Sequence, residues 1–167
     1  MKNALREKML KGEKTVGTFL FINSASAVES LGLAGLDYII IDGEHAAFDA
    51  QNVLEFARAA KLYGTTPLAR VTEINRSSIL RFLDAGAMGL IIPCVNTYEE
   101  AKAIVQWGKY APVGKRGVSA SAGTDFWMTD FATQGFDINK DKTILHKNHG
   151  YRYSKIAKQS NINLCFG

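Results

Sequence analysis

The chain has 167 residues, 47% hydrophobic and 22% charged, a composition typical of a globular domain and not of a disordered chain. No apolar run reaches the roughly 18 residues of a membrane span, and the charged N-terminus lacks the apolar core of a signal peptide, so we expect no membrane partner. Residues 1–134 have no net charge and residues 135–167 carry the whole +4; because a nucleic-acid-binding body usually has a basic patch, we expect no nucleic-acid partner.

Strand-like apolar runs alternate with helical patterns along the first two thirds of the chain. The runs predict strands over Val16–Ile22, Tyr38–Ile41, Pro67–Val71 and Leu90–Pro93. Asp49, Asn75 and Thr97 stand where helix N-caps are expected, and Glu100 follows Thr97 in the spacing of a capping box. Strands that alternate with helices predict a parallel sheet with the strands paired in chain order.

Two α/β architectures fit this alternation, a doubly wound open sheet and a (β/α)₈ TIM barrel. A dinucleotide-binding sheet has a glycine-rich turn after its first strand. The corresponding turn reads INSASAVE and has no glycine, which disfavours that fold. In a barrel, catalytic residues collect at the carboxyl ends of the strands, and the unusual polar residues of this chain stand there.

The first such group is Asp42-Gly43-Glu44-His45, directly after the second strand. A histidine beside a carboxylate can act as a general base near neutral pH. The alternative is a helix-entry loop whose charges face water. Carboxylates next to a buried strand are costly unless they are solvated or paired, so both interpretations stay open.

Arg70 lies late in the third strand, where an inward guanidinium is costly unless it meets an anion. The fork of arginine donors suits a carboxylate or an enolate. The alternative is a strand arginine paired with Glu73 or Glu44. Arg116, between two glycines in VGKRGVS, is a candidate for contact with an anion or another subunit, and a surface turn is its alternative.

The remaining candidates carry weaker signals. Cys94 has no neighbouring histidine in the sequence and is expected to pack. It is too far from Cys165 for a CxxC pair, and we expect a cytoplasmic protein with reduced thiols. His146 and His149 are three residues apart and could share a helical face as metal ligands, but no third ligand stands near them.

The segments TVGTFL, AGLDYIIIDGEHAAFD, PLARV, LDAGAMGLIIPCVNTYEEA and KYAPVGKRGVSAS, in this order, resemble the HpcH/HpaI aldolase/citrate lyase family. Within it, the 4-hydroxy-2-oxoheptanedioate and 2-dehydro-3-deoxyglucarate aldolases are the most similar. The resemblance runs from about Lys2 to about Gln134. It implies a TIM barrel and a carbon–carbon lyase that cleaves 4-hydroxy-2-oxo acids to pyruvate and an aldehyde.

The resemblance also implies roles for particular residues. Arg70 would stabilise the enolate, and His45, oriented by Asp42, would be the acid/base. Glu44 and Arg116 would join Arg70 in binding the small 2-oxo acid. A divalent cation (Mg²⁺, Mn²⁺ or Co²⁺) is expected as cofactor, but the family segments that supply its Glu and Asp ligands, similar to VQVES and GPADLS, are absent from this sequence.

The resemblance therefore divides the chain into a partial TIM-barrel domain over residues 1–134, with the first four to five βα units, and a basic atypical tail over residues 135–167. We interpret the tail as a replaced terminus of the kind a frameshift gives. We expect little or no aldolase turnover from the chain as it stands. The alternative is a catalytically dead remnant that acts only by association; open sheet edges invite pairing, and a homo-oligomer is expected.

Overall fold

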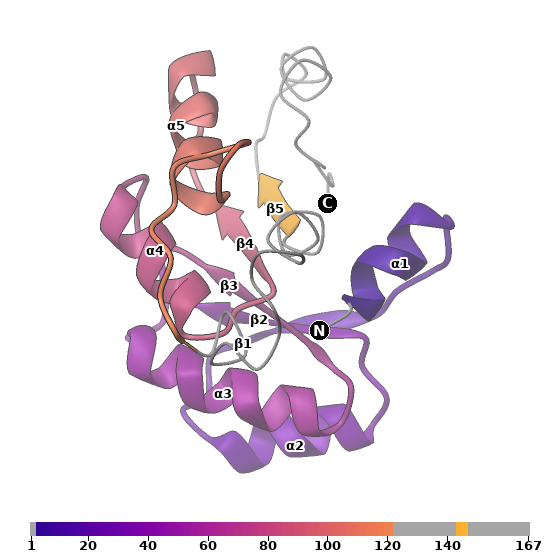
Figure 1. Cartoon of the computed structure of the whole chain (residues 1–167). Helices are drawn as coiled ribbons and strands as arrows, with labels where there is room; N and C mark the ends of the chain where they lie inside the picture. Colours follow the sequence, from indigo (N-terminus) through magenta and orange to yellow (C-terminus); the bar gives the residue numbers. More distant parts are fainter. Residues whose placement is uncertain (1–2, 122–142, 147–167) are drawn as a thin grey trace.

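The fold is built from alternating helices and strands, as the sequence predicts. The computed structural model describes residues 3–121 and 143–146. The elements are, in order, α1 (Ala4–Leu10), β1 (Gly17–Leu20), α2 (Ala25–Leu33), β2 (Tyr38–Asp42), α3 (Ala50–Leu62), β3 (Thr66–Arg70), α4 (Arg76–Asp84), β4 (Gly89–Ile92), α5 (Tyr98–Gly108) and β5 (Thr143–His146) (Figure 1).

The five strands form one parallel sheet in the order β1-β2-β3-β4-β5. The four predicted strands and their parallel pairing in chain order are thus confirmed. Strands that follow one another in chain order, with a helix after each of the first four, are the arrangement of a TIM barrel and not of a doubly wound sheet. β5 is an addition, because the sequence analysis placed no strand in residues 135–167.

Side-chain caps begin the helices at the predicted positions. The side chains of Asp49, Asn75 and Thr97 each accept a hydrogen bond from a backbone N–H in the first turn of α3, α4 and α5. Thr97 and Glu100 form the predicted capping box. Ser24 caps α2 in the same way and was not singled out in the sequence.

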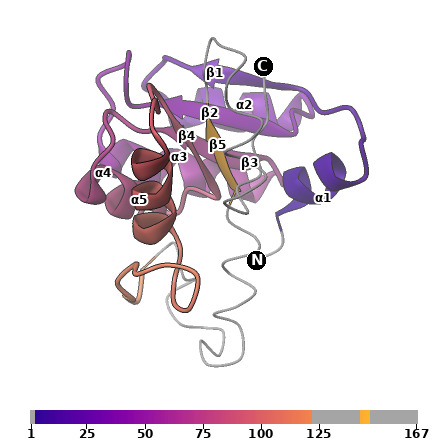
Figure 2. The ribbon, with the colours of Figure 1, turned by 90° about the horizontal axis from the view of Figure 1, so that it is seen from above.

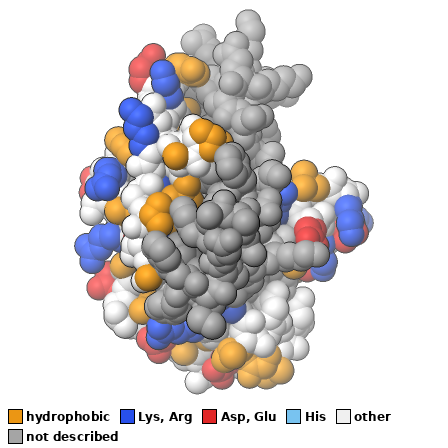
Figure 3. Space-filling model, viewed as in Figure 1, with side chains coloured by type: hydrophobic (Ala, Val, Ile, Leu, Met, Phe, Trp, Pro, Cys, Tyr) orange, Lys and Arg blue, Asp and Glu red, His pale blue; other side chains and the backbone are white. Residues whose placement is uncertain are grey.

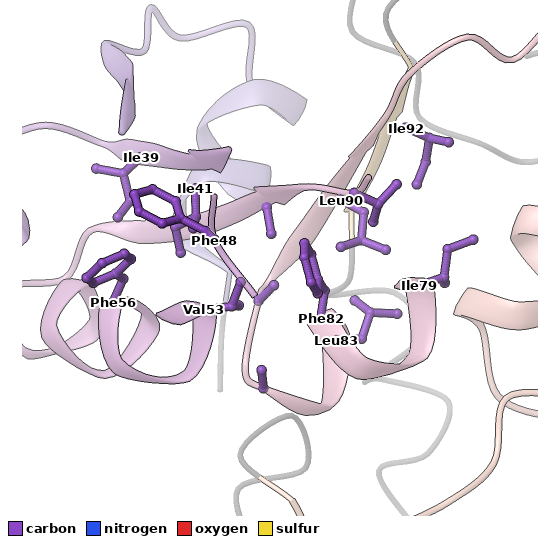
Figure 4. Packing of buried hydrophobic residues seen from close by; sticks show 14 of the residues in the cluster. Ile39, Ile41, Phe48, Val53, Phe56, Ile79, Phe82, Leu83, Leu90 and Ile92 are labelled. Carbon is purple, nitrogen blue, oxygen red and sulfur yellow. The ribbon is translucent and has the colours of Figure 1, made fainter. Parts of the chain in front are cut away.

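The main core lies between the sheet and the helices of its outer face. Ile39 and Ile41 of β2 point toward this layer and pack with residues such as Phe56 and Leu83 from α3 and α4 (Figure 4). Phe48 and Phe56 meet edge to face, with ring centroids 5.3 Å apart. The side chains at the odd-numbered positions of β2 therefore pack against the helices.

The even positions of β2 and their neighbours form the inner face of the sheet. A second, smaller apolar cluster there joins Ile40, Leu68 and Ile91 to Leu5 of α1. Helix α1 stands on this inner side, apart from the other helices (Figure 2). Side chains that follow these positions toward the carboxyl ends of the strands must lie on the same inner face, since side chains alternate along a strand.

The surface of the described residues is mixed in charge. Lysine, arginine and acidic side chains are interspersed on the face shown in Figure 3. Within residues 3–121 and 143–146, no helix combines the length and the apolar composition that crossing a bilayer requires.

Candidate functional site

The carboxyl ends of β2 and β3 bring Asp42 and Arg70 together. The two residues are register partners in the parallel ladder. Each lies two positions beyond an inner-face residue, Ile40 or Leu68, so both side chains lie on the inner face. Both are buried, at 0% and 5% exposure. The charged residues that the sequence analysis singled out on two separate strands thus form one cluster.

Gly43 allows the backbone of the turn after β2 to approach the backbone of β3 closely. Its backbone N–H donates to the Arg70 carbonyl at 2.9 Å. A Cβ at this position would lie 2.7 Å from that carbonyl oxygen and 2.7 Å from the Phe82 ring. Only a residue without a side chain fits this approach, which holds Glu44 and His45 close to β3.

The Asp42 carboxylate is the centre of the cluster. Its Oδ1 accepts hydrogen bonds from Arg70 Nε at 2.8 Å and from the backbone N–H groups of Glu44 at 3.0 Å and His45 at 3.2 Å. Its Oδ2 accepts from Arg70 Nη2. This two-point pairing of a guanidinium with a carboxylate is the strongest geometry that such an ion pair has.

These contacts shift the pKa values of both partners. Burial by itself raises the pKa of the Asp42 carboxyl, but the hydrogen bonds from Arg70 and from the backbone of His45 and Glu44 outweigh it, so the pKa lies below its ordinary value. The hydrogen bond to Asp42 raises the pKa of Arg70 despite its burial. Both side chains are therefore charged at neutral pH.

The lowered pKa of Asp42 makes a prediction about acid stability. A carboxyl whose pKa is lower in the folded state than in the unfolded state, where it is about 3.9, stabilises the fold at pH values above that unfolded-state pKa. This contribution is lost as the pH falls through the folded-state pKa. We expect the unfolding free energy to fall as the pH drops below about 4, with a smaller fall in Asp42→Asn. Urea denaturation from pH 7 to pH 2.5 measures this. Equal slopes for both proteins would contradict it.

The Arg70 guanidinium is held from three directions. In addition to Asp42, its Nη1 lies 3.2 Å from Glu44 Oε2. Its Cζ lies 4.9 Å from the centre of the Phe19 ring. The hydrogen bonds to Asp42 use two of the five N–H donors of arginine, and Glu44 faces Nη1 as an ion-pair partner. Among the contacts between described residues, one N–H on Nη1 and one on Nη2 remain for a ligand.

His45 lies at the outer rim of this cluster. Its side chain is 66% exposed, and Nε2 lies 3.7 Å from Glu44 Oε2. The structure differs here from the expectation that Asp42 orients the imidazole, because Asp42 binds the backbone N–H of His45. Glu44 is the carboxylate beside the ring. It lies between His45 and Arg70, the two residues for which the family resemblance implies proton transfer and charge stabilisation.

Arg116 does not join the cluster. Its side chain is fully buried and pairs with Asp84 at 2.5 Å, while its Cζ lies 4.7 Å from the Tyr110 ring centre. Asp84 is the last residue of α4, a helix that leads away from the carboxyl end of β3 to the opposite end of the sheet. Within the described residues Arg116 is thus held by Asp84 and Tyr110 and not by the Asp42–Arg70 cluster, and its role in substrate binding stays a prediction.

The described residues do not by themselves form a metal site. Within residues 3–121 and 143–146, no three His, Cys, Asp or Glu side chains are grouped so as to hold an ion, and Asp42 is already committed to Arg70. His146 lies in strand β5 and not on a helix, and His149 is outside the described residues. Cys94 is exposed rather than packed, at the carboxyl end of β4.

Phe19 is the residue of this cluster that the sequence analysis missed. It is the register partner of Ile40, which places its ring on the inner face beneath Arg70. An aromatic residue in an apolar strand gives no functional signal of its own. The period-two alternation of the strands, combined with the parallel register, is the signal that could have placed it beside Arg70.

Comparisons with known proteins identify similar sequences. The sequence profile of the family described as HpcH/HpaI aldolase/citrate lyase matches residues 15–159, past the boundary near Gln134 that the motifs suggested. A 2-keto-3-deoxy-L-rhamnonate aldolase of Klebsiella pneumoniae subsp. pneumoniae is 37% identical over 120 residues, which are 72% of this chain and 45% of the relative. The protein of the same name from Escherichia coli K12 is 36% identical over 121 residues, again 72% and 45% of the two chains.

Solved structures of similar proteins have the same fold. The crystal structure of an HpcH/HpaI aldolase from Desulfitobacterium hafniense DCB-2 superposes with a TM-score of 0.89 and 31% identity, over 98% of this chain and 65% of that one. A family protein from Burkholderia cenocepacia J2315 gives a TM-score of 0.87 and 27% identity, over 99% and 69%. The chain spans just under half the length of the curated relatives it matches.

Proposed function

Because the chain belongs to the HpcH/HpaI aldolase/citrate lyase family, we propose that the cluster around Arg70 binds the pyruvate part of a 4-hydroxy-2-oxo acid and contributes to its cleavage to pyruvate and an aldehyde. The observation that carries this proposal is the two-point Asp42–Arg70 pair at the carboxyl ends of β2 and β3. It fixes a buried cation where barrel enzymes bind their substrates.

Arg70 is proposed to stabilise the charge that develops during cleavage. When the bond between C3 and C4 breaks, its electron pair forms the C2–C3 double bond, and the π pair of the C2 carbonyl moves to the oxygen to give an enolate. The two remaining N–H groups of Arg70 can donate to that oxygen. Because the side chain is only 6% exposed, the interaction is stronger than it would be in water.

His45 is proposed to move the proton. It accepts the proton of the C4 hydroxyl as the aldehyde leaves, and a proton is then placed on C3 of the enolate to give pyruvate. Its exposed position allows transfer directly or through one water molecule. Glu44, whose Oε2 lies 3.7 Å from Nε2 of the ring, can stabilise the imidazolium that forms.

A divalent cation is expected as cofactor only because of the family to which the chain belongs. Such an ion would polarise the keto oxygen of the substrate. The described residues do not fit a cation by themselves, so no step above depends on one. Assays therefore contain added Mg²⁺, Mn²⁺ or Co²⁺.

A second candidate function is association without catalysis. Strand β1 is the edge of the described sheet and pairs there only with β2. Val16, Phe21 and Ile22, at and beyond its ends, are 66%, 57% and 65% exposed. An edge strand flanked by exposed apolar side chains favours pairing with another chain, and we propose a homo-oligomer on this basis.

Pyruvate release separates the two candidates. The purified chain, with each cation in turn, is incubated with a 4-hydroxy-2-oxo acid, and pyruvate is measured by a coupled dehydrogenase. Glu55→Ala, which changes an exposed residue of α3, is the control. Pyruvate release that is lost in His45→Ala and kept in Glu55→Ala supports the aldolase proposal and overturns the expectation of little turnover. No release, together with a dimer in sedimentation, supports association alone.

A further inference from the structure

Phe19 is the only aromatic ring recorded against the Arg70 guanidinium within the described residues. It lies on β1, two strands away from Arg70 on β3. The long side chain of Arg70 therefore reaches from β3 across Asp42 of β2 to the edge strand. The Phe19 ring therefore lies at the end of the Arg70 side chain, on the inner face of the sheet.

The contacts of Arg70 constrain it in two different ways. Asp42 and Glu44 bind its nitrogen atoms and so fix the position of the guanidinium edges. Neither carboxylate covers a face of the planar group. The Arg70 Cζ instead lies over the face of the Phe19 ring, 4.9 Å from its centre, within the range at which a cation is attracted to an aromatic face.

Phe19 is itself well supported. It packs against the inner cluster of Leu5, Ile40, Leu68 and Ile91. On its other side, it stacks on Phe21 with ring centroids 6.0 Å apart and planes inclined by 16°. These contacts place the partly buried Phe19 ring between the inner cluster and the Arg70 guanidinium.

We infer that Phe19 is a positioning residue for Arg70, whose ring sets the height and tilt of the guanidinium so that its two remaining N–H donors point at the 2-oxo acid. The identity of the ligand as a 2-oxo acid rests on the proposed function, whereas the contact between ring and guanidinium is independent of it. Phe19 touches no substrate in this account and acts through Arg70. A misplacement of about 1 Å in such a group can cost a large factor in rate.

The test compares Phe19→Leu, which removes the aromatic face and keeps an apolar side chain, with Phe19→Tyr, which keeps the face. Tyr63→Leu is the matched control, because it removes a ring that is 41% exposed at the C-cap of α3, at the opposite end of β3 from Arg70, and it should leave both readouts unchanged. Two readouts are used on the full chain labelled with ¹⁵N-arginine. One is the Nε–Hε signal of Arg70, and the other is the affinity for oxalate, a planar mimic of the pyruvate enolate, in the presence of Mn²⁺.

We expect Phe19→Leu to move the Arg70 signal, through loss of the ring current, and to speed exchange of its Nε proton with water. Oxalate affinity should fall on the order of tenfold, and Phe19→Tyr should restore both readouts. An unchanged Arg70 signal in a folded Phe19→Leu protein overturns the inference; Phe19→Met replaces that variant if it fails to fold. A shifted signal in a chain that binds no oxalate would reject the proposed function and keep the contact.

Discussion

Replacing Asp42 with alanine is expected to lower the free energy of unfolding by about 3–5 kcal/mol, because the change leaves the buried Arg70 charge without its main partner. The carboxylate also accepts the backbone N–H groups of Glu44 and His45, and these donors would lose their acceptor. Urea denaturation at pH 7, followed by circular dichroism, measures the loss.

The matched control for this prediction is Asp49→Ala. Asp49 is exposed to solvent at the start of α3, where it caps the helix, and loss of an N-cap costs typically about 1 kcal/mol. A loss in Asp42→Ala no larger than that of the control would contradict the central place of Asp42. Because both changes remove one acidic side chain, the difference between them does not come from net charge.

Replacing Arg70 with lysine is expected to slow exchange of the pyruvate methyl protons with solvent by about 10²–10³-fold, the effect of losing a main stabiliser of a developing oxyanion. Lysine keeps the positive charge but not the planar fork that binds both Asp42 oxygens and still presents two donors. Proton NMR of pyruvate in D₂O, with added Mn²⁺ kept low or with Mg²⁺, measures the exchange rate.

Arg58→Lys is the control for the Arg70 prediction, since Arg58 is exposed on α3. Thermal unfolding of both variants shows whether each still folds. An Arg70→Lys protein that remains folded and exchanges pyruvate protons at the rate of the unchanged chain would remove Arg70 from the chemistry. It would leave the Asp42–Arg70 pair as a purely structural contact.

Local patterns were sufficient to predict the strands and the caps. Four apolar runs of the right length, separated by caps such as Asp49 and Asn75, determine strand–helix alternation without any long-range information. The parallel order follows, because connections of this length favour neighbouring parallel strands. β5 was missed because its four residues, TILH, lie in a polar and basic stretch in which no alternation stands out.

The partners of the charged residues could not be predicted in the same way. The sequence brought Arg70 and Glu44 together as one alternative, but the stronger partner, Asp42, depends on the β2–β3 register. The family resemblance implied that Asp42 orients the His45 imidazole, whereas the turn at Gly43 presents the backbone N–H of His45 to that carboxylate. Arg116 looked like a ligand-binding residue between glycines, and the pairing with Asp84 is visible only in three dimensions.

The most direct test of this account is an oxalate titration of the chain labelled with ¹⁵N-arginine, in the presence of Mg²⁺, followed through the arginine Nε–Hε signals. We expect the signal assigned to Arg70, by its loss in Arg70→Lys, to shift with saturation as oxalate binds, while the Arg58 signal stays in place. Oxalate that binds without moving the Arg70 signal, or that does not bind, would contradict a 2-oxo acid site at the Asp42–Arg70 pair.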